Sequence, residues 1–256
     1  MPYTTLISAA QLQALQASAT PAVVFDCSCD LMQPAQGPAQ YAESHIAGAL
    51  YAHLDNNLSA KGDPAVTGAQ SGGRHPLPAR EKFAQWLGSM GLNNTDQVVV
   101  YDRQGANYCG RLWWMLKWCG HEAVAVLDGG FQAWQASGAP VASGSEHEPA
   151  TPGSFVLQPA RVVTADTGGI ARRLGTPEQT LIDARGAPRF RGEVEPLDPV
   201  AGHIPGALNR PFVQNIGEDG RFKPAHVLHP SAQYCGAVRL VEIGLGATDV
   251  PVRACM

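Results

Sequence analysis

The stretch Gly202-His203-Ile204-Pro205-Gly206-Ala207-Leu208 occurs in two similar copies in this chain. The earlier copy is Ser44-His45-Ile46-Ala47-Gly48-Ala49-Leu50, which lies 158 positions before it (203 − 45). Upstream of each copy an apolar run ends in aspartate, Val23-Val24-Phe25-Asp26 and Thr180-Leu181-Ile182-Asp183, at an offset of 157 (183 − 26). Two motifs that recur in the same order and at nearly the same spacing indicate an internal duplication.

A third pair of stretches extends the repeat toward the end of the chain. Residues 91–102 match residues 244–255 without a gap, at an offset of 153 (244 − 91), so Asp102 falls on Cys255. The stretches before them, Pro78 to Met90 and Pro230 to Ile243, both predict a helix opened by proline. On this correspondence Cys255 follows a strand in the second copy, as Asp102 does in the first.

Short β-branched runs alternate with stretches of helical periodicity, a pattern typical of βαβ units and of parallel sheets covered by helices. In the first copy we expect strands near residues 22–26, 98–102 and 123–127, and helices near 8–17, 78–90, 107–119 and 130–136. A capping box at Ser8-Ala9-Ala10-Gln11 would open the first helix. The sequence therefore predicts an α/β protein of two domains, each a parallel sheet flanked by helices.

The predicted domains are residues 1–140 and 160–256. The linker between them, residues 141–159, lacks periodicity and is rich in small residues and proline. After Asp102 the first copy continues for 36 residues to Gly138 (138 − 102), whereas only Met256 follows Cys255. We therefore expect the second domain to be truncated, with a sheet that lacks a strand and two of its covering helices.

The composition excludes several classes of function. With 18 basic and 22 acidic residues, the 256-residue chain has a net charge of −4 and offers no summed positive field for nucleic acid or for an anionic membrane. No apolar run approaches the roughly 20 residues of a membrane span, and the first residues lack signal-peptide features. Six cysteines in a chain of this size favour reduced thiols over a disulfide framework, so we expect a soluble cytoplasmic protein. Cys27-Ser28-Cys29 lacks a second close Cys or His pair that would complete a zinc site, and no metal is predicted.

One edge of each predicted sheet is the expected place for chemistry. In open α/β sheets, ligands bind beyond the carboxyl ends of the strands, where backbone N–H groups at the start of the next helix can bind an anion. A cysteine there has its thiolate favoured by these groups and its sulfur exposed. Cys255 takes this place in the second copy. Asp102 takes it in the first and cannot act as a soft nucleophile, so the first copy is expected to be non-catalytic.

These motifs in combination resemble the tandem-domain rhodanese family of thiosulfate and 3-mercaptopyruvate sulfurtransferases. The resemblance runs from about Thr4 to Ala225. In the first copy it is carried by residues 98–102, 111–114 and 126–131 with Trp134, and in the second by residues 181–185, 189–193 and 202–207.

The resemblance implies an inert N-terminal domain and a catalytic C-terminal domain. Cys255 would take a sulfane sulfur from a small anionic donor, thiosulfate or 3-mercaptopyruvate, and pass it from a persulfide to a thiophilic acceptor such as cyanide or a thiol. Arg189 matches the family's substrate-binding arginine in position, and its guanidinium suits the oxygens of such a donor. No cofactor is implied, and the sequence leaves the choice of donor open.

Each predicted site residue has an alternative. Cys109 and Cys235 are rival nucleophiles, although Cys109 stands where a loop enters a helix and Cys235 falls inside a predicted helix. Arg189 could instead form a surface ion pair with Glu193 or Glu195. His45 and His203 recur in both copies, so we expect them to fix loops by hydrogen bonds and not to act in catalysis.

Two other kinds of protein are weighed against a sulfurtransferase. A phosphatase of similar fold needs an arginine six positions after its cysteine, and none of the six cysteines has one. The second alternative, a non-catalytic rhodanese-like binding protein or relic without a complete active-site loop, stays open.

Overall fold

The computed structural model describes residues 1–62, 74–144, 151–228, 240–242 and 250–253, the last two ranges by their backbone only. The chain divides into two units. Unit 1 comprises residues 1–60, 78–161 and 218–221, and unit 2 comprises residues 61–77, 162–217 and 222–256.

A five-stranded parallel sheet forms the centre of unit 1, with the strand order β1-β6-β5-β2-β4. Its strands are β1 (Leu6–Ile7), β2 (Val23–Asp26), β4 (Leu50–Tyr51), β5 (Val98–Tyr101) and β6 (Val124–Leu127). The helices are α1 (Ala9–Gln16), α2 (Gln36–Glu43), α3 (Arg80–Ser89), α4 (Cys109–Trp118) and α5 (Gly130–Ala136). A separate antiparallel pair joins β3 (His45–Ile46) to β7 (Val141–Ala142).

The strands and helices predicted for the first copy are all confirmed, with ends within two residues of the expected ones. The capping box that opens α1 is also formed, since the side chains of Ser8 and Gln11 each accept a hydrogen bond from the other's backbone N–H.

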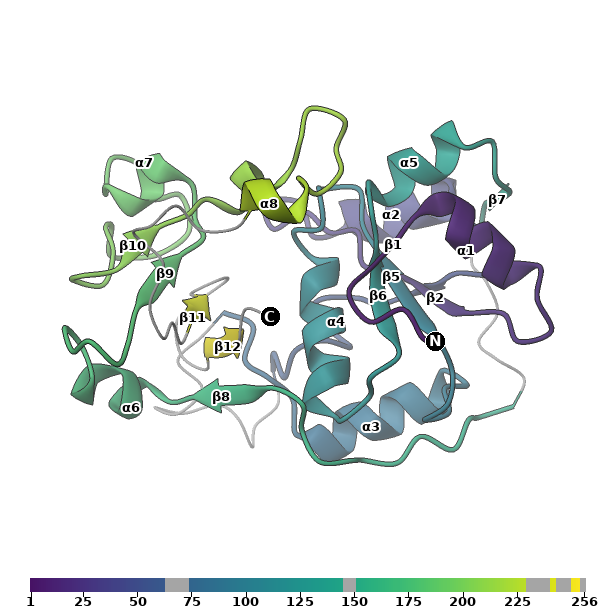
Figure 1. Ribbon diagram of the computed structural model, residues 1–256, viewed down its shortest axis with the longest axis horizontal. Helices are drawn as coiled ribbons and strands as arrows, with labels where there is room; N and C mark the ends of the chain where they lie inside the picture. The colour runs from purple at the N-terminus through teal and green to yellow at the C-terminus, as the bar shows by residue number, and fades with distance from the viewer. Residues whose placement is uncertain (63–73, 145–150, 229–239, 243–249, 254–256) are drawn as a thin grey trace. The chain divides into compact units, whose positions relative to one another are not determined.

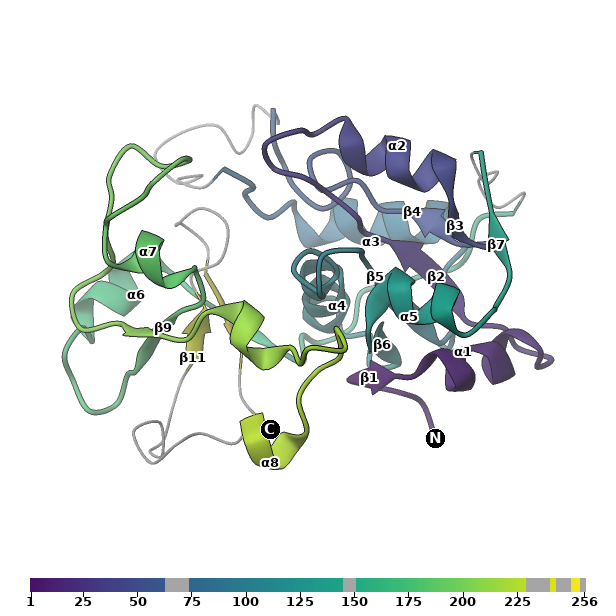
Figure 2. The same ribbon diagram turned by 90° about the horizontal axis from the view of Figure 1, so that it is seen from above.

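Helices cover both faces of the unit 1 sheet, α1 and α5 on one face and α3 and α4 on the other (Figure 1, Figure 2). The alternation of side chains along each strand explains this arrangement. Val24 of β2 packs in one core cluster with Leu12 of α1 and Trp134 of α5. The next residue, Phe25, turns to the opposite face, where its ring centroid lies 5.8 Å from that of Trp86 in α3.

Unit 2 also has a five-stranded sheet, with the order β10-β9-β11-β12-β8. Its strands are β8 (Val163–Ala165), β9 (Leu181–Asp183), β10 (Leu208–Asn209), β11 (Leu240–Glu242) and β12 (Val250–Arg253). The helices are α6 (Thr167–Arg172), α7 (Ala187–Phe190), the 3-10 turn η1 (Phe212–Asn215) and α8 (Ala225–Leu228). β10 and β11 pair in parallel with β9, whereas β12 runs antiparallel to both β11 and β8.

The structure corrects three expectations for the second half of the chain. The helix predicted over 230–243 is wrong at 240–242, which form β11, while residues 230–239 lie outside the described part. The sheet does not lack a strand, because β11 and β12 complete a set of five. By place in the sheet β11 corresponds to β5 and β12 to β6, whereas the sequence repeat matched β12 with β5. A segment of three residues carries no periodicity that separates helix from strand, so pairing with β9 decides the structure of β11.

The segment predicted as a linker follows the surface of unit 1 wherever it is described. Asn94 exchanges two hydrogen bonds of 2.8 Å with the backbone of Val156, and Phe155 is buried. The change from unit 1 to unit 2 comes after Arg161. Among the described helices, none has the length and apolar character needed to cross a membrane.

Candidate active site

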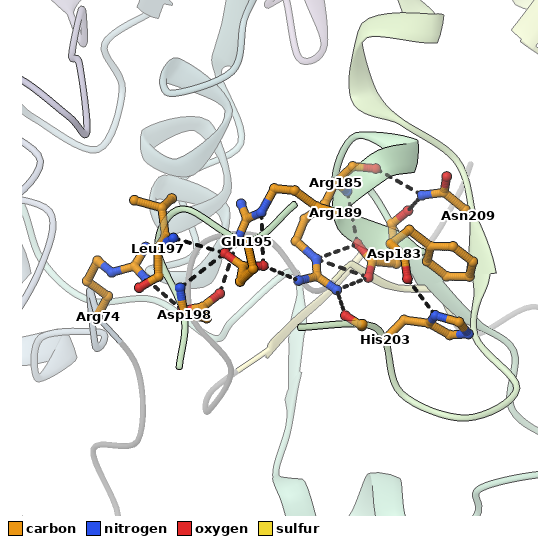
Figure 3. A network of polar contacts seen from close by, with 11 residues as sticks. Arg74, Asp183, Arg185, Arg189, Glu195, Leu197, Asp198, His203 and Asn209 are labelled. Atoms are coloured by element: carbon orange, nitrogen blue, oxygen red, sulfur yellow. Dashed lines mark hydrogen bonds and ion pairs between the residues drawn. The ribbon is translucent and has the colours of Figure 1, made fainter. Parts of the chain in front are cut away.

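The end of β9 in unit 2 carries a buried ion pair (Figure 3). Asp183 is 1% exposed, and its carboxylate accepts hydrogen bonds from Nε of Arg185 at 3.0 Å and from Nη2 at 2.6 Å. Nη2 of Arg185 also donates to the carbonyl of Gly202 at 2.7 Å, directly before His203. Bidentate guanidinium pairs are short and directional, so Arg185 ties the end of β9 to the loop that carries the repeated motif.

Arg189, the predicted donor-binding residue, lies on α7 beside this pair. Its Nε and Nη2 donate to the two carboxylate oxygens of Glu195 at 3.1 and 2.6 Å, and Nη2 also donates to Asp198 at 3.0 Å. The side chain is 22% exposed, and its Nη1 has no hydrogen-bond partner among the described residues. One edge of the guanidinium is thus held by carboxylates, while the Nη1 group can still donate to an anion.

Glu195 is the centre of this network. Its side chain is only 5% exposed, and it accepts hydrogen bonds from Arg189, from Arg185 at 3.4 Å and from the backbone N–H groups of Leu197 and Asp198. Burial alone would raise the pKa of Glu195, but the hydrogen bonds from Arg189 and from the backbone N–H groups of Asp198 and Leu197 lower it to about 2. Glu195 is therefore ionised at neutral pH and fixes both arginines.

The network ends at Arg74, whose Nη2 lies 2.5 Å from Oδ1 of Asp198 and also donates to the carbonyl of Leu197. Three guanidinium groups face three carboxylates along it: Arg74, Arg185 and Arg189 against Asp183, Glu195 and Asp198. Two glutamates were considered from the sequence as partners of Arg189, and in the structure Arg189 forms its ion pair with Glu195. Glu193 pairs instead with Arg191, 2.6 Å away, and both of these side chains are 54% exposed.

The two repeated histidines have the same surroundings in their respective units. Nδ1 of His203 lies 2.7 Å from the carbonyl oxygen of Phe190, and Nδ1 of His45 lies 2.7 Å from that of Tyr41. Each imidazole is also stacked on the ring of that same aromatic residue, with centroids 3.7 Å apart in unit 2 and 4.0 Å apart in unit 1. The prediction that both histidines fix loops by hydrogen bonds is confirmed.

Unit 1 also has a buried strand-end aspartate bound to arginine, but that arginine comes from elsewhere in the chain. Asp26, which is fully buried, accepts a hydrogen bond of 2.7 Å from Nη1 of Arg103, which follows β5. Arg103 also donates to Oγ of Ser28 and to the carbonyl of Ser44, and its guanidinium lies 4.1 Å from the ring centroid of Phe131. Sequence reasoning missed Arg103; the one available signal was its place directly after Asp102 at a strand end.

Asp102 occupies the place where the chemistry of unit 1 was expected. It is 1% exposed, and its carboxylate accepts four backbone N–H hydrogen bonds of 2.8 to 2.9 Å from the loop that leads into α4, donated by Gln104, Ala106, Tyr108 and Cys109. These N–H groups are thereby engaged by the chain's own carboxylate.

Four of the described residues in unit 1 are cysteines, all of them thiols. Cys27, Cys109 and Cys119 are buried, and Cys29 is partly exposed. Burial, followed by the charges of Asp26 and Asp102, raises the pKa of Cys27 well above its usual value, and burial raises that of Cys119 to about 11. Within the described ranges, no three His, Cys, Asp or Glu side chains are grouped so that they could hold a metal ion.

The predicted nucleophile Cys255 and its rival Cys235 lie outside the described residues. The strand before Cys255 is described: in the antiparallel register of β12, Arg253 lies opposite Leu240, at the start of β11. Because β11 is parallel to β9, β12 ends at the edge of the sheet opposite to the one where Asp183 and Arg185 lie. The role of Cys255 therefore stays a prediction from the sequence repeat.

Comparison with known proteins agrees with the fold and with the motifs. Residues 8–137 match the model of the family described as "Rhodanese-like domain". The chain is 44% identical over 225 residues to a Pseudomonas aeruginosa protein whose name reads "Probable 3-mercaptopyruvate sulfurtransferase", covering 88% of this chain and 76% of that protein. A Mycobacterium tuberculosis protein named "Putative thiosulfate sulfurtransferase SseB" is 36% identical over 217 residues, 85% of this chain and 74% of that protein.

Among solved structures, the crystal structure of SseA from Escherichia coli superimposes with a TM-score of 0.77 at 27% identity, covering 96% of this chain and 90% of that one. That structure was reported for the "Rhodanese" fold of 3-mercaptopyruvate sulfotransferases. The chain therefore belongs to the rhodanese family of thiosulfate and 3-mercaptopyruvate sulfurtransferases.

Proposed function

We propose that this protein moves a sulfane sulfur from 3-mercaptopyruvate or thiosulfate to a thiophilic acceptor, cyanide or a thiol, through a cysteine persulfide. The observation that carries the proposal is the 44% identity to the Pseudomonas aeruginosa relative over most of both chains. Arg189 supports it, because a guanidinium whose Nη1 group binds none of the described residues suits a small anion.

The reaction has two displacements in which sulfur changes partners. A cysteine thiolate attacks the outer sulfur of the donor, the donor's bond to that sulfur breaks, and sulfite or the enolate of pyruvate leaves with the electron pair, the enolate then taking a proton. The acceptor next attacks the outer sulfur of the persulfide, and the cysteine thiolate leaves. Arg189 binds the carboxylate or sulfonate-type oxygens of the donor throughout.

The two domains have different tasks in this proposal. Residues 1–140 form a non-catalytic domain. In it Asp102 stands in place of a nucleophile, and its carboxylate accepts hydrogen bonds from the backbone N–H groups of the loop that follows. Residues 160–256, after the segment 141–159, form the catalytic domain of a tandem repeat, with Arg189 as the donor site and Cys255 as the nucleophile. The assignment of Cys255 rests on its match to Asp102 in the sequence alone, because β12, the strand before Cys255, takes the place of β6 and not of β5 in the sheet.

The proposed partners are a small anionic sulfur donor and a thiophilic acceptor, with no nucleic acid and no membrane. The proposed location is the cytoplasm, in keeping with the thiol state of the four described cysteines.

Steady-state kinetics with both donors test the proposal. We expect thiocyanate from thiosulfate and cyanide, pyruvate from 3-mercaptopyruvate, loss of both with Cys255→Ser, and a donor KM at least about tenfold higher with Arg189→Gln, the effect of losing one charged hydrogen bond. The matched control is Arg191→Gln, because Arg191 is exposed and binds only Glu193 in the described structure. If the unsubstituted protein consumes neither donor, the chain is a non-catalytic rhodanese-like binding protein.

A further inference from the structure

Two carboxylates hold Arg189, and they differ in every respect that decides which can be exchanged. Glu195 is 5% exposed, makes two hydrogen bonds to Arg189 and is anchored by the backbone N–H groups of Leu197 and Asp198. The side chain of Asp198 is 33% exposed and makes a single hydrogen bond of 3.0 Å to Arg189. Glu195 is built into the fold, whereas Asp198 lies where solvent and solutes can reach it.

Asp198 forms a second ion pair, with Arg74. Its other carboxylate oxygen lies 2.5 Å from Nη2 of Arg74, and that same Nη2 donates to the carbonyl of Leu197 at 2.9 Å. A carboxylate that leaves Arg189 thus keeps one charged partner and contact with water, which removes most of the cost of an unpaired charge.

The charge of the network matters for an anionic ligand. Three guanidinium groups and three carboxylates sum to zero, so an anion that approaches Arg189 meets no net positive charge while Asp198 is in place. Without the charge of Asp198 the same group carries a net charge of +1 (3 − 2), and attraction to an anion rises with the anion's own charge.

We propose that Asp198 is a specificity-determining residue for the sulfur donor: its carboxylate occupies Arg189 and is exchanged for the donor's anionic group, while Glu195 keeps the guanidinium oriented. This rests on the proposed role of Arg189 as the donor site. Only a ligand with anionic oxygens can replace a carboxylate on this guanidinium, so neutral sulfur compounds are excluded, and Asp198 sets how strongly dianions are favoured over monoanions.

Equilibrium binding in the Cys255→Ser background tests this, because the probe then binds without transferring sulfur. The probes are thiosulfate, a dianion, and pyruvate, a monoanion. We expect Asp198→Asn and Asp198→Ala to bind thiosulfate about three to ten times more tightly, with a smaller gain for pyruvate. Glu195→Gln, which also removes a negative charge, should instead bind thiosulfate about threefold more weakly, because the guanidinium loses its orientation.

Glu193→Gln is the matched control, since it removes an exposed carboxylate close in sequence that binds only Arg191 in the described structure. Its affinity for thiosulfate should stay within about twofold of the parent's. Binding that is unchanged or weaker in both Asp198 variants, while Arg189→Gln abolishes it, would overturn the role of Asp198 and leave Arg189 as the donor site. Binding unaffected by Arg189→Gln would overturn the proposed role of Arg189 and this inference with it.

Discussion

β2 in unit 1 and β9 in unit 2 both end in a buried aspartate that is bound to a guanidinium group, but the two arginines lie at different positions in the sequence relative to that aspartate. In unit 2 Arg185 lies two residues after Asp183 and binds it locally. In unit 1 the equivalent position is Ser28, and Arg103 reaches Asp26 from the loop after β5. Both guanidinium groups also donate to the carbonyl that precedes the repeated histidine, of Gly202 or Ser44.

This difference shows that both units place a guanidinium group beside the strand-end aspartate, although the arginine that supplies it comes from a different part of the sequence in each unit. In unit 1, Arg103 links the loop after β5 to the end of β2. The carboxylate of Asp102 accepts hydrogen bonds from the backbone N–H groups of the loop after β5. Unit 1 therefore closes its strand-end edge with its own charged groups. In unit 2 the local pair leaves a second arginine, Arg189, whose Nη1 group has no hydrogen-bond partner in the described part of the chain.

The largest effect on stability should come from replacing Arg103 or Arg185, because either substitution leaves a buried carboxylate without its charged partner. We expect Arg103→Met to lower the free energy of unfolding of unit 1 by about 4 kcal/mol, and Arg185→Met to lower that of unit 2 by a similar amount. Hydrogen exchange in urea, followed on peptides from β2 and β9, assigns each loss to its unit.

The arginine of unit 1 can also be moved to the position that it has in unit 2. Adding Ser28→Arg to Arg103→Met places a guanidinium where unit 2 has Arg185, and we expect it to recover part of the lost stability. A loss below about 1 kcal/mol in both single variants would show that these pairs are not equivalent stabilising devices.

Much of unit 1 could be predicted from the sequence, because its β5 and β6 strands are buried four-residue runs without a charged residue, and β2 is an apolar run that ends in Asp26. Asp183, His203 and Arg189 could also be found, since each belongs to a local motif. The partners Arg103 and Arg74 could not, because they lie 77 and 124 positions in the sequence from the carboxylates that they bind, Asp26 and Asp198. The wrong place given to β12 has the same origin: a gapless sequence match does not specify which strand pairs with β9.

A smaller effect is expected from Asp102→Ala. Removing the carboxylate leaves the four backbone N–H groups before α4 without their acceptor, and we expect unit 1 to lose about 3 kcal/mol of stability. Asp102→Asn, which keeps one acceptor oxygen, should lose about half as much. Thermal unfolding with both variants measures this, and equal stability of Asp102→Ala and the parent would contradict a structural role for the carboxylate.

The smallest effect separates the two repeated histidines. His45 is fully buried and His203 is exposed, although each bonds the corresponding carbonyl. We expect His45→Ala to destabilise unit 1 by about 2 kcal/mol, and His203→Ala to destabilise unit 2 by clearly less, because water can replace the lost hydrogen bond. Equal losses in urea unfolding would mean that burial does not distinguish the two sites.

The central claim, that unit 2 carries the chemistry and unit 1 does not, is tested most directly by locating the persulfide. The protein is incubated with 3-mercaptopyruvate or thiosulfate without an acceptor, cleaved, and examined by peptide mass spectrometry for the addition of one sulfur atom. We predict the added sulfur on the peptide that contains Cys255 and its absence from the peptides of Cys27, Cys29, Cys109 and Cys119. A persulfide on any of these four cysteines would contradict the account.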